Sequence, residues 1–258
     1  MVFNYYPGCT LKNKATELDV YARASAELLG FELREIENWQ CCGAVYPLGA
    51  DVVAEKLPSV RALQAAQVQG RPLVTLCSAC HHVLKRVNDD AQKSKDFRDT
   101  VARYDDELAY SGNAEVLHYL EVLKNHIGFE ELAKKVKKPL TGKKIGAYYG
   151  CMLLRPSSIM AFDDPENPTL IEDFIRALGG KVVPYPLRGE CCGGYISLNC
   201  PNKADEMSQK IHADATRLDA NFLITACPLC AYNMKKQGKL PIYYFTEILA
   251  EALGIKDE

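Results

Sequence analysis

The chain has 258 residues, of which 48% are hydrophobic and 25% charged, a balance typical of globular domains. Its 31 basic and 33 acidic residues are mixed along the chain and give a formal net charge of −2, which excludes the dominant basic face of a nucleic-acid-binding protein. No apolar run reaches the roughly 20 residues that span a bilayer, and residues 1–4 lack the basic start of a signal peptide, so we expect a cytoplasmic protein.

The first half of the chain alternates between short β-prone runs and helical patterns. In chain order, the predicted elements are a strand at 2–6, a helix at 18–29, a strand at 32–36, a helix at 51–69 and a strand at 73–76. Gly30 is a typical stop for the first helix. The polar residues 87–112 have no counterpart in the second half, and we predict that they form a surface helical insertion.

The second half repeats this order after a lysine-rich junction. Its predicted elements are a strand at 144–149, a helix at 168–178, a strand at 181–185, a helix at 201–218 and a strand at 222–226. For the first of these helices, Asn167 is the predicted cap, Pro168 the first helical residue and Gly179 the stop.

The order strand, helix, strand, helix, strand predicts parallel pairing within each half. The predicted fold is therefore α/β, with two pseudo-symmetric Rossmann-like repeats. Cysteine motifs follow the strands of each half, and parallel strands end at the same edge of a sheet, where ligands bind in this class of fold. We expect cysteines that are distant in the sequence to gather at that edge.

Cysteine is the unusual component of the composition, with 11 residues. A reducing compartment keeps thiols free, so this number indicates metal or redox chemistry in place of a disulfide framework. Ten cysteines fall into two sets, each with a leading cysteine, a Cys-Cys-Gly motif and a Cys-x-x-Cys motif. We call Cys9, Cys41, Cys42, Cys77 and Cys80 the first quintet, and Cys151, Cys191, Cys192, Cys227 and Cys230 the second quintet.

The spacing and the flanking residues of the quintets repeat as well. The distance from the cysteine pair to Cys-x-x-Cys is the same in both, from position 42 to 77 and from 192 to 227. Tyr-Pro-Gly precedes the first leading cysteine and Tyr-Tyr-Gly the second, and Glu-Val-Leu from Glu121 matches Glu-Ile-Leu from Glu247. We infer an internal duplication, with domains at residues 1–138 and 139–258.

The number of thiols in each half, five, can be compared with the number of ligands that zinc sites and iron–sulfur clusters take. A structural zinc ion takes four ligands, commonly from two Cys-x-x-Cys pairs, and each half has only one such pair. A cubane iron–sulfur cluster also takes four cysteines and would leave one spare in each half. The same spare thiol in both copies favours a larger or non-cubane iron–sulfur assembly, although zinc remains an alternative.

The repeated cysteine pattern resembles the paired CCG domains of the B subunit of heterodisulfide reductase. Ten cysteines match in order and spacing over nearly the whole chain, and the segment from Gly150 to Pro156 adds to the likeness. The resemblance implies two non-cubane [4Fe-4S] clusters, each held by one quintet. It also implies reduction of a disulfide to two thiols, by homolytic S–S cleavage between the clusters.

The resemblance further implies partners that supply the electrons. The chain has neither a dinucleotide-binding fingerprint nor a ferredoxin-type cysteine run. We therefore expect an iron–sulfur C subunit and a flavin-containing A subunit in one complex. The substrate is left open, since a coenzyme M–coenzyme B disulfide fits methanogenesis, whereas another disulfide fits a bacterium.

Two other functions stay open beside disulfide reduction. Related CCG proteins transfer electrons in lactate, glycolate or fumarate metabolism, and a zinc-binding assembly module is the third alternative. Weak candidates for substrate contact are His81, Arg155 and Lys12, which lie close to cluster cysteines in the sequence. Cys200 stands outside both quintets, and we expect it to be a small buried thiol.

Overall fold

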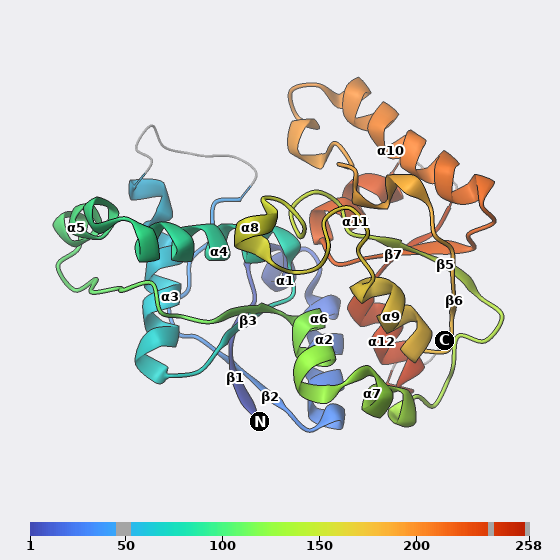
Figure 1. Ribbon diagram of the computed structural model, residues 1–258, viewed down its shortest axis with the longest axis horizontal. Coiled ribbons are helices and arrows are strands. Elements are labelled where there is room, and N and C mark those ends of the chain that lie inside the picture. The colour runs from blue at the N-terminus through green and yellow to red at the C-terminus, as the bar shows by residue number, and fades with distance from the viewer. Residues whose placement is uncertain (45–52, 237–239, 256–258) are drawn as a thin grey trace.

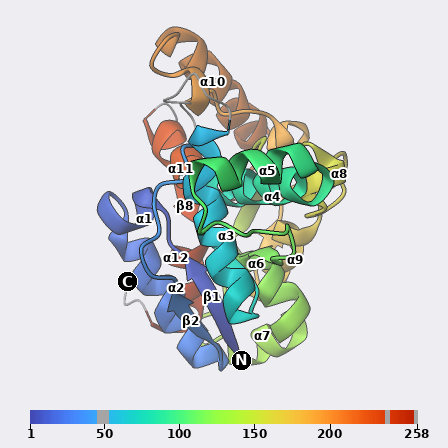
Figure 2. The same ribbon diagram turned by 90° about the vertical axis from the view of Figure 1, so that its left-hand side faces the viewer.

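The computed structural model describes residues 1–44, 53–236 and 240–255, which form two four-stranded parallel sheets with helices around them (Figures 1 and 2). The first half contains β1 (Val2–Tyr6), α1 (Cys9–Asn13), α2 (Thr16–Leu29), β2 (Glu32–Glu35), η1 (Ala54–Lys56), α3 (Leu57–Gln69), β3 (Leu73–Thr75), α4 (Ser78–Lys93), α5 (Lys95–Tyr104), β4 (Val116–His118), α6 (Tyr119–Val122), η2 (Leu123–Ile127) and α7 (Phe129–Lys135). The second half contains β5 (Lys144–Tyr148), α8 (Ser157–Met160), α9 (Leu170–Ala177), β6 (Lys181–Val182), η3 (Pro186–Gly189), η4 (Gly194–Ile196), α10 (Pro201–Arg217), β7 (Phe222–Thr225), α11 (Pro228–Lys235), β8 (Ile242–Tyr244) and α12 (Phe245–Ala252).

The two sheets have the same topology. Their strand orders are β2-β1-β3-β4 and β6-β5-β7-β8, with every neighbouring pair parallel. This confirms the predicted α/β class with two pseudo-symmetric repeats. No helix within the described ranges is long and apolar enough to cross a membrane.

Each sheet has one more strand than the sequence predicted. β4 and β8 are only three residues long, too short for a periodic pattern to reveal. Both strands run directly into a helix that is capped by a repeated glutamate. Glu121 Oε2 accepts from the backbone N–H of His118 at 2.6 Å, and Glu247 Oε2 accepts from that of Tyr244 at 2.7 Å. The repeated Glu-x-Leu sequence is thus a capping signal.

Several predicted element boundaries were wrong, among them the start of α2, which begins at Thr16 and not at residue 18. The predicted strand at 181–185 is limited to Lys181–Val182. Helix α9 begins at Leu170 and not at Pro168, because Asp163 Oδ2 accepts from the backbone N–H groups of Thr169 and Leu170 at 2.7 and 2.6 Å. Helix α3 begins at Leu57, and residues 51 and 52 of the longer predicted helix lie outside the described residues.

The predicted insertion at residues 87–112 is helical as far as Tyr104. Helix α4 starts in the cysteine motif and continues into the insertion, and α5 follows after a break at Ser94. Ser94 Oγ accepts from the backbone N–H of Phe97 at 3.1 Å and so caps α5, which lies at one end of the molecule (Figure 1). The division of the chain at residues 138 and 139 remains a prediction.

One hydrophobic cluster extends through both halves, and a second lies within the second half. Helix α12 of the second half packs against α2 of the first, where Thr246 Oγ1 donates to the carbonyl oxygen of Leu18 at 3.1 Å. Helix α8 lies against α4, and Lys85 Nζ donates to the carbonyl oxygen of Met160 at 2.6 Å (Figure 1). This shared packing fixes the carboxyl edges of the two sheets relative to each other.

Candidate metal centre

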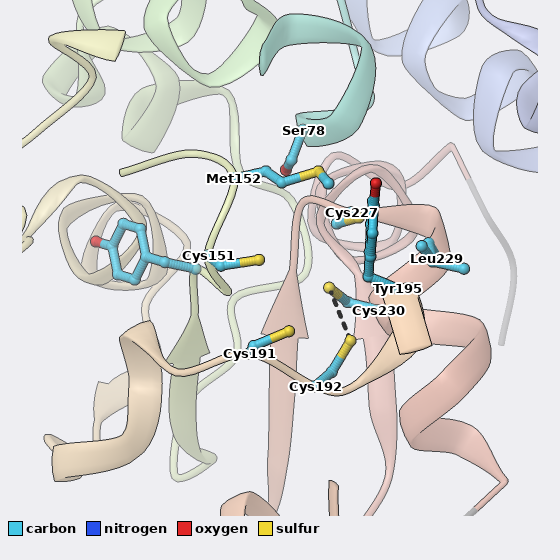
Figure 3. Close-up of a pocket in the computed structure, with 10 residues that line it drawn as sticks. Ser78, Cys151, Met152, Cys191, Cys192, Tyr195, Cys227, Leu229 and Cys230 are labelled. Carbon is cyan, nitrogen blue, oxygen red and sulfur yellow. Dashed lines mark hydrogen bonds between the residues drawn. The ribbon is translucent and has the colours of Figure 1, made fainter. Parts of the chain in front are cut away.

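Five thiols of each half come from three segments at the carboxyl edge of its sheet. In the first half, Cys41 Sγ lies 3.5 Å from Cys9 Sγ, and Cys42 Sγ lies 3.5 Å from Cys80 Sγ. In the second half, Cys192 Sγ lies 3.4 Å from Cys230 Sγ. The five sulfur atoms of the second quintet point toward a common space in Figure 3. The predicted convergence of each quintet therefore occurs.

Further contacts between neighbouring thiols connect each quintet into one series. Cys77 of the first quintet and Cys227 of the second lie close enough to perturb each other, which raises the pKa of Cys77 and lowers that of Cys227. The whole series runs through Cys9, Cys41, Cys42, Cys80, Cys77, Cys227, Cys230, Cys192, Cys191 and Cys151. The two quintets thus meet at their Cys-x-x-Cys motifs.

Exposure follows the same order in both quintets. Cys9 and Cys41 are exposed, and their counterparts Cys151 and Cys191 are partly exposed. The remaining thiols of both quintets are buried, namely Cys42, Cys77, Cys80, Cys192, Cys227 and Cys230. Each half of the thiol series therefore leads from the surface to the interface between the halves.

Backbone contacts hold the two Cys-x-x-Cys motifs together at that interface. Ser78 donates to the carbonyl oxygen of Ala226 from both its backbone N–H and its hydroxyl, at 3.1 and 2.7 Å. Tyr244 OH also donates to the carbonyl oxygens of Leu76 and Ala226, which precede Cys77 and Cys227. Ser78 faces the pocket of the second quintet from the first half (Figure 3).

A tyrosine holds each Cys-Cys-Gly loop. Tyr6 OH donates to the carbonyl oxygen of Gln40 at 2.5 Å, and Tyr148 OH donates to that of Glu190 at 2.7 Å. Both carbonyls belong to the residue immediately before a cysteine pair. Burial raises the pKa of both phenols, so that each stays protonated and donates. The repeated tyrosine was visible in the sequence, but its partner was not.

Glycine before each leading cysteine allows the backbone to approach the thiols. Gly8 has a φ of +75°, and a Cβ atom there would lie 2.8 Å from Cys80 Sγ. Gly150 has a φ of +66°, and a Cβ atom there would lie 3.4 Å from Cys230 Sγ. A side chain at position 8 would therefore displace the Cys80 thiol as well as strain the backbone.

The substitution Gly8→Ala is expected to remove the metal of the first quintet and to leave that of the second. Metal analysis of the purified variant measures this as a loss of about half the metal, since one of two equal ligand sets is displaced. Gly30→Ala is the matched control, because Gly30 has a φ of +89° but a Cβ atom there would meet no other atom within 4 Å. Equal metal contents in the two variants would contradict the prediction.

The thiols of each quintet differ in pKa. Hydrogen bonding from Cys41, then from Cys80, lowers the pKa of Cys42 to about 4, and bonding from Cys151, then from Cys192, lowers that of Cys191 to about 2. Each quintet therefore carries thiolate at neutral pH, and the thiolate is the form that binds metal.

The donor set of each quintet fits an iron–sulfur assembly. All five donors are sulfur, and backbone N–H groups of Gly193 and Gly194 donate to Cys191 Sγ at 3.4 Å and Cys192 Sγ at 3.3 Å. Such bonds to sulfur are one of the means by which proteins tune iron–sulfur potentials. In the part of the chain that the structure describes, no group of three His, Cys, Asp or Glu side chains is arranged to hold a single ion. The extended series suits a group with several metal atoms.

The weak candidates for substrate contact lie in different settings. His81 is fully buried, with Nε2 3.2 Å from Glu121 Oε2. Lys12 Nζ lies 2.7 Å from Glu35 Oε2, and Arg155 Nη1 donates to the carbonyl oxygen of Gly189 at 2.9 Å. Of these three candidates, Lys12 and Arg155 reach the surface, and their role in binding remains a prediction.

Cys200 is exposed, so the expectation of a buried thiol was wrong. It precedes α10 at the N-cap position. A chain entering a helix from the surface leaves this side chain in solvent, outside both quintets.

Comparison with known proteins decides the family. A family model of the CCG cysteine-rich domain matches residues 3–85 and again residues 145–235, one match for each half. The chain belongs to the CCG cysteine-rich domain family. The two matches cover both quintets and confirm the predicted resemblance and the duplication of the cysteine motif.

Curated relatives of this CCG chain carry two kinds of name. A Wolinella succinogenes protein named "8-methylmenaquinol:fumarate reductase membrane anchor subunit" is 34% identical over 98% of this chain and 92% of its own length. An Archaeoglobus profundus protein, named as similar to the B subunit of heterodisulfide reductase, is 25% identical over 99% of this chain and 92% of its own. The B subunit of a Methanosarcina acetivorans heterodisulfide reductase is 24% identical over 98% of this chain and 89% of its own.

A similar fold is found among solved structures. A hypothetical protein from Helicobacter pylori superposes on 99% of the CCG chain with a TM-score of 0.77 and 14% sequence identity. The chain spans 49% of that protein's length. This likeness concerns the fold alone.

The names of the curated relatives support an oxidoreductase that works as a subunit of a larger complex.

Proposed function

We propose that this CCG protein is the catalytic iron–sulfur subunit of a heterodisulfide reductase-type complex, which reduces a disulfide to two thiols. The observation that carries the proposal is the convergence of two equal sets of five thiols, whose Cys-x-x-Cys motifs are held together where Ser78 donates to the carbonyl oxygen of Ala226. A disulfide needs two electrons, and two equivalent ligand sets beside one interface suit a reaction in which each sulfur receives one.

The first quintet would hold one non-cubane [4Fe-4S] cluster and the second quintet the other. When bound, the clusters supply one electron to each sulfur of the disulfide as the S–S bond breaks homolytically, and two protons complete the two thiols. The protein positions the ligands for this chemistry. Tyr6 and Tyr148 hold the two Cys-Cys-Gly loops, and Ser78 fastens the first half to the second beside Cys77 and Cys227.

Electrons would enter from partner subunits. The outer thiols of both quintets are exposed or partly exposed, so a partner can approach the ligand sets from the surface. Such a partner carries conventional iron–sulfur clusters, as expected of a C subunit, and a flavin-containing A subunit completes the complex. Disulfide reduction in the cytoplasm is consistent with these partners.

A second function is favoured by the Wolinella relative. Its identity of 34% exceeds the 25% and 24% of the two heterodisulfide reductase relatives, and its name places it in a fumarate reductase. In this alternative the same ten cysteines would hold the clusters, and the protein would pass electrons between a quinol and another subunit without binding a disulfide.

Anaerobic reoxidation separates the two functions. The protein, chemically reduced under anaerobic conditions, is mixed with a series of disulfides that includes the coenzyme M–coenzyme B disulfide, and visible absorbance and free thiols are measured. We expect one disulfide to reoxidise the protein with release of two thiols for every two electrons. Reoxidation by a quinone but by no disulfide would overturn the proposal and support the electron-relay function. The control is Cys230→Ala, which should lose the reaction with the disulfide.

A further inference from the structure

The two quintets have equal ligands, but the residues behind them differ. In the second half, the carbonyl oxygen of Cys192 accepts two hydrogen bonds from buried side chains. Asn233 Nδ2 donates to it at 2.6 Å and Ser208 Oγ donates to it at 3.0 Å. Asn233 Nδ2 also lies 3.2 Å from Ser208 Oγ, so that the three groups form a closed set. Asn233 is 5% exposed and Ser208 is fully buried.

The hydrogen bonds among Asn233, Ser208 and the Cys192 carbonyl connect the two segments that carry Cys192 and Cys230. Asn233 lies on α11, three residues after Cys230, whereas Cys192 lies in the loop before η4. The amide of Asn233 therefore fixes the Cys192 backbone against the helix that bears Cys230, and Ser208 adds the support of α10. The two thiols that this contact brings together are 3.4 Å apart.

The described residues of the first half form no such set. The residue three positions after Cys80 is Val83, which has no side-chain donor. On α3, the helix that corresponds to α10, Ser59 Oγ is buried and has no hydrogen-bond partner among the described residues. Equal ligand sets are thus followed, three residues after Cys-x-x-Cys, by a hydrogen-bonding asparagine in one half and by a valine in the other.

We propose that Asn233 is a positioning residue that pre-forms the second quintet, so that the second site holds its metal more tightly than the first. Residues behind the ligands commonly change metal affinity by about 10- to 100-fold when they are replaced. The inference rests on the proposed function only in treating the ten cysteines as ligands of two metal groups.

Chelation of the metal-loaded full-length protein tests the proposal. An iron chelator is added under anaerobic conditions, and iron release is followed together with the electron paramagnetic resonance signals of the reduced protein. The wild type is expected to release iron in two phases, and Asn233→Val is expected to accelerate the slow phase about tenfold while the fast phase is unchanged. Asn202→Val is the matched control, since Asn202 lies exposed on α10.

A labelling experiment on the metal-free full-length chain gives a readout that does not depend on iron. Asn233→Val is expected to raise the rate of maleimide labelling at Cys192 about tenfold, because the buried carbonyl loses the closer of its two donors, and to leave Cys42 unchanged. Equal rates at Cys192 in the variant and the wild type would overturn the inference. An equal rise at both cysteines would also overturn it, since it would indicate general loosening.

Two further variants keep the test decisive if Asn233→Val fails to fold. Asn233→Asp has the same shape but replaces the amide donor with an acceptor, and Ser208→Ala removes one of the two bonds to the Cys192 carbonyl. Both are expected to raise Cys192 labelling selectively, with the smaller rise in Ser208→Ala. If the chain bound no iron, the proposed function would fail, yet the labelling rates would still decide the role of Asn233.

Discussion

A chain in which Cys192 and Cys230 are both replaced by alanine is expected to bind half of the iron and sulfide of the wild type. The two thiols lie 3.4 Å apart at the inner end of the second quintet, and their loss leaves that site with three of its five ligands. The first quintet keeps all five. Iron and acid-labile sulfide per chain, measured after anaerobic purification, check the prediction.

The matched control is Cys200→Ala, because Cys200 is exposed and outside both quintets. That variant should keep the full iron content. Loss of all iron from the double variant would show that the quintets form one inseparable site. An unchanged iron content would show that the second quintet binds none, and either result would contradict the account of two separate sites.

Phe245→Ala is expected to lower the free energy of unfolding by about 3–5 kcal/mol, the cost typical of a large aromatic side chain lost from a core. Phe245 is fully buried at the start of α12. Its ring centroid lies 4.9 Å from that of Tyr244, 5.8 Å from that of Tyr119 and 6.4 Å from that of Phe174. The substitution therefore leaves a cavity between the two halves.

Urea denaturation of the metal-free chain, followed by circular dichroism, measures this cost. Val68→Ala serves as the control, because Val68 is 78% exposed and its truncation should change stability by no more than about 0.5 kcal/mol. If the two variants unfolded at the same urea concentration, packing in the hydrophobic cluster shared by the halves would not be what joins them.

The sequence was sufficient for the features that repeat. Ten cysteines with matching intervals predicted two ligand sets, and strands placed before them predicted their convergence at the sheet edges. Residues such as Gly8 and Gly150 were recognised because they hold the same place before a leading cysteine in both halves. Repetition supplied a second copy against which each motif could be compared.

Features that depend on tertiary contacts were not predictable. The contact between Cys77 and Cys227 arises from the packing of one half on the other, which no local pattern encodes. The start of α9 depends on Asp163, a side chain several residues upstream that satisfies the first backbone N–H groups of the helix. The bond from Asn233 to the Cys192 carbonyl joins residues 41 positions apart and has no counterpart among the described residues of the first half.

The duplication also allows residues that are the same in both halves to be distinguished from residues that differ between them. The thiols, the tyrosines and the capping glutamates are the same in both halves, which is expected of features that build and hold a metal site. The residues that follow Cys-x-x-Cys differ, with His81 and His82 in one half and Ala231 and Tyr232 in the other. His82 Nδ1 lies 3.1 Å from the carbonyl oxygen of Met152, beside the leading cysteine of the other quintet. Such differences make the two sites unequal in their surroundings.

Metal analysis of the anaerobically purified protein tests the central claim most directly. Iron, acid-labile sulfide and zinc are measured in the same sample, relative to the protein concentration. The account predicts iron and sulfide in the amounts of two four-iron clusters per chain, with zinc absent. Zinc bound in place of iron, with no labile sulfide, would contradict it.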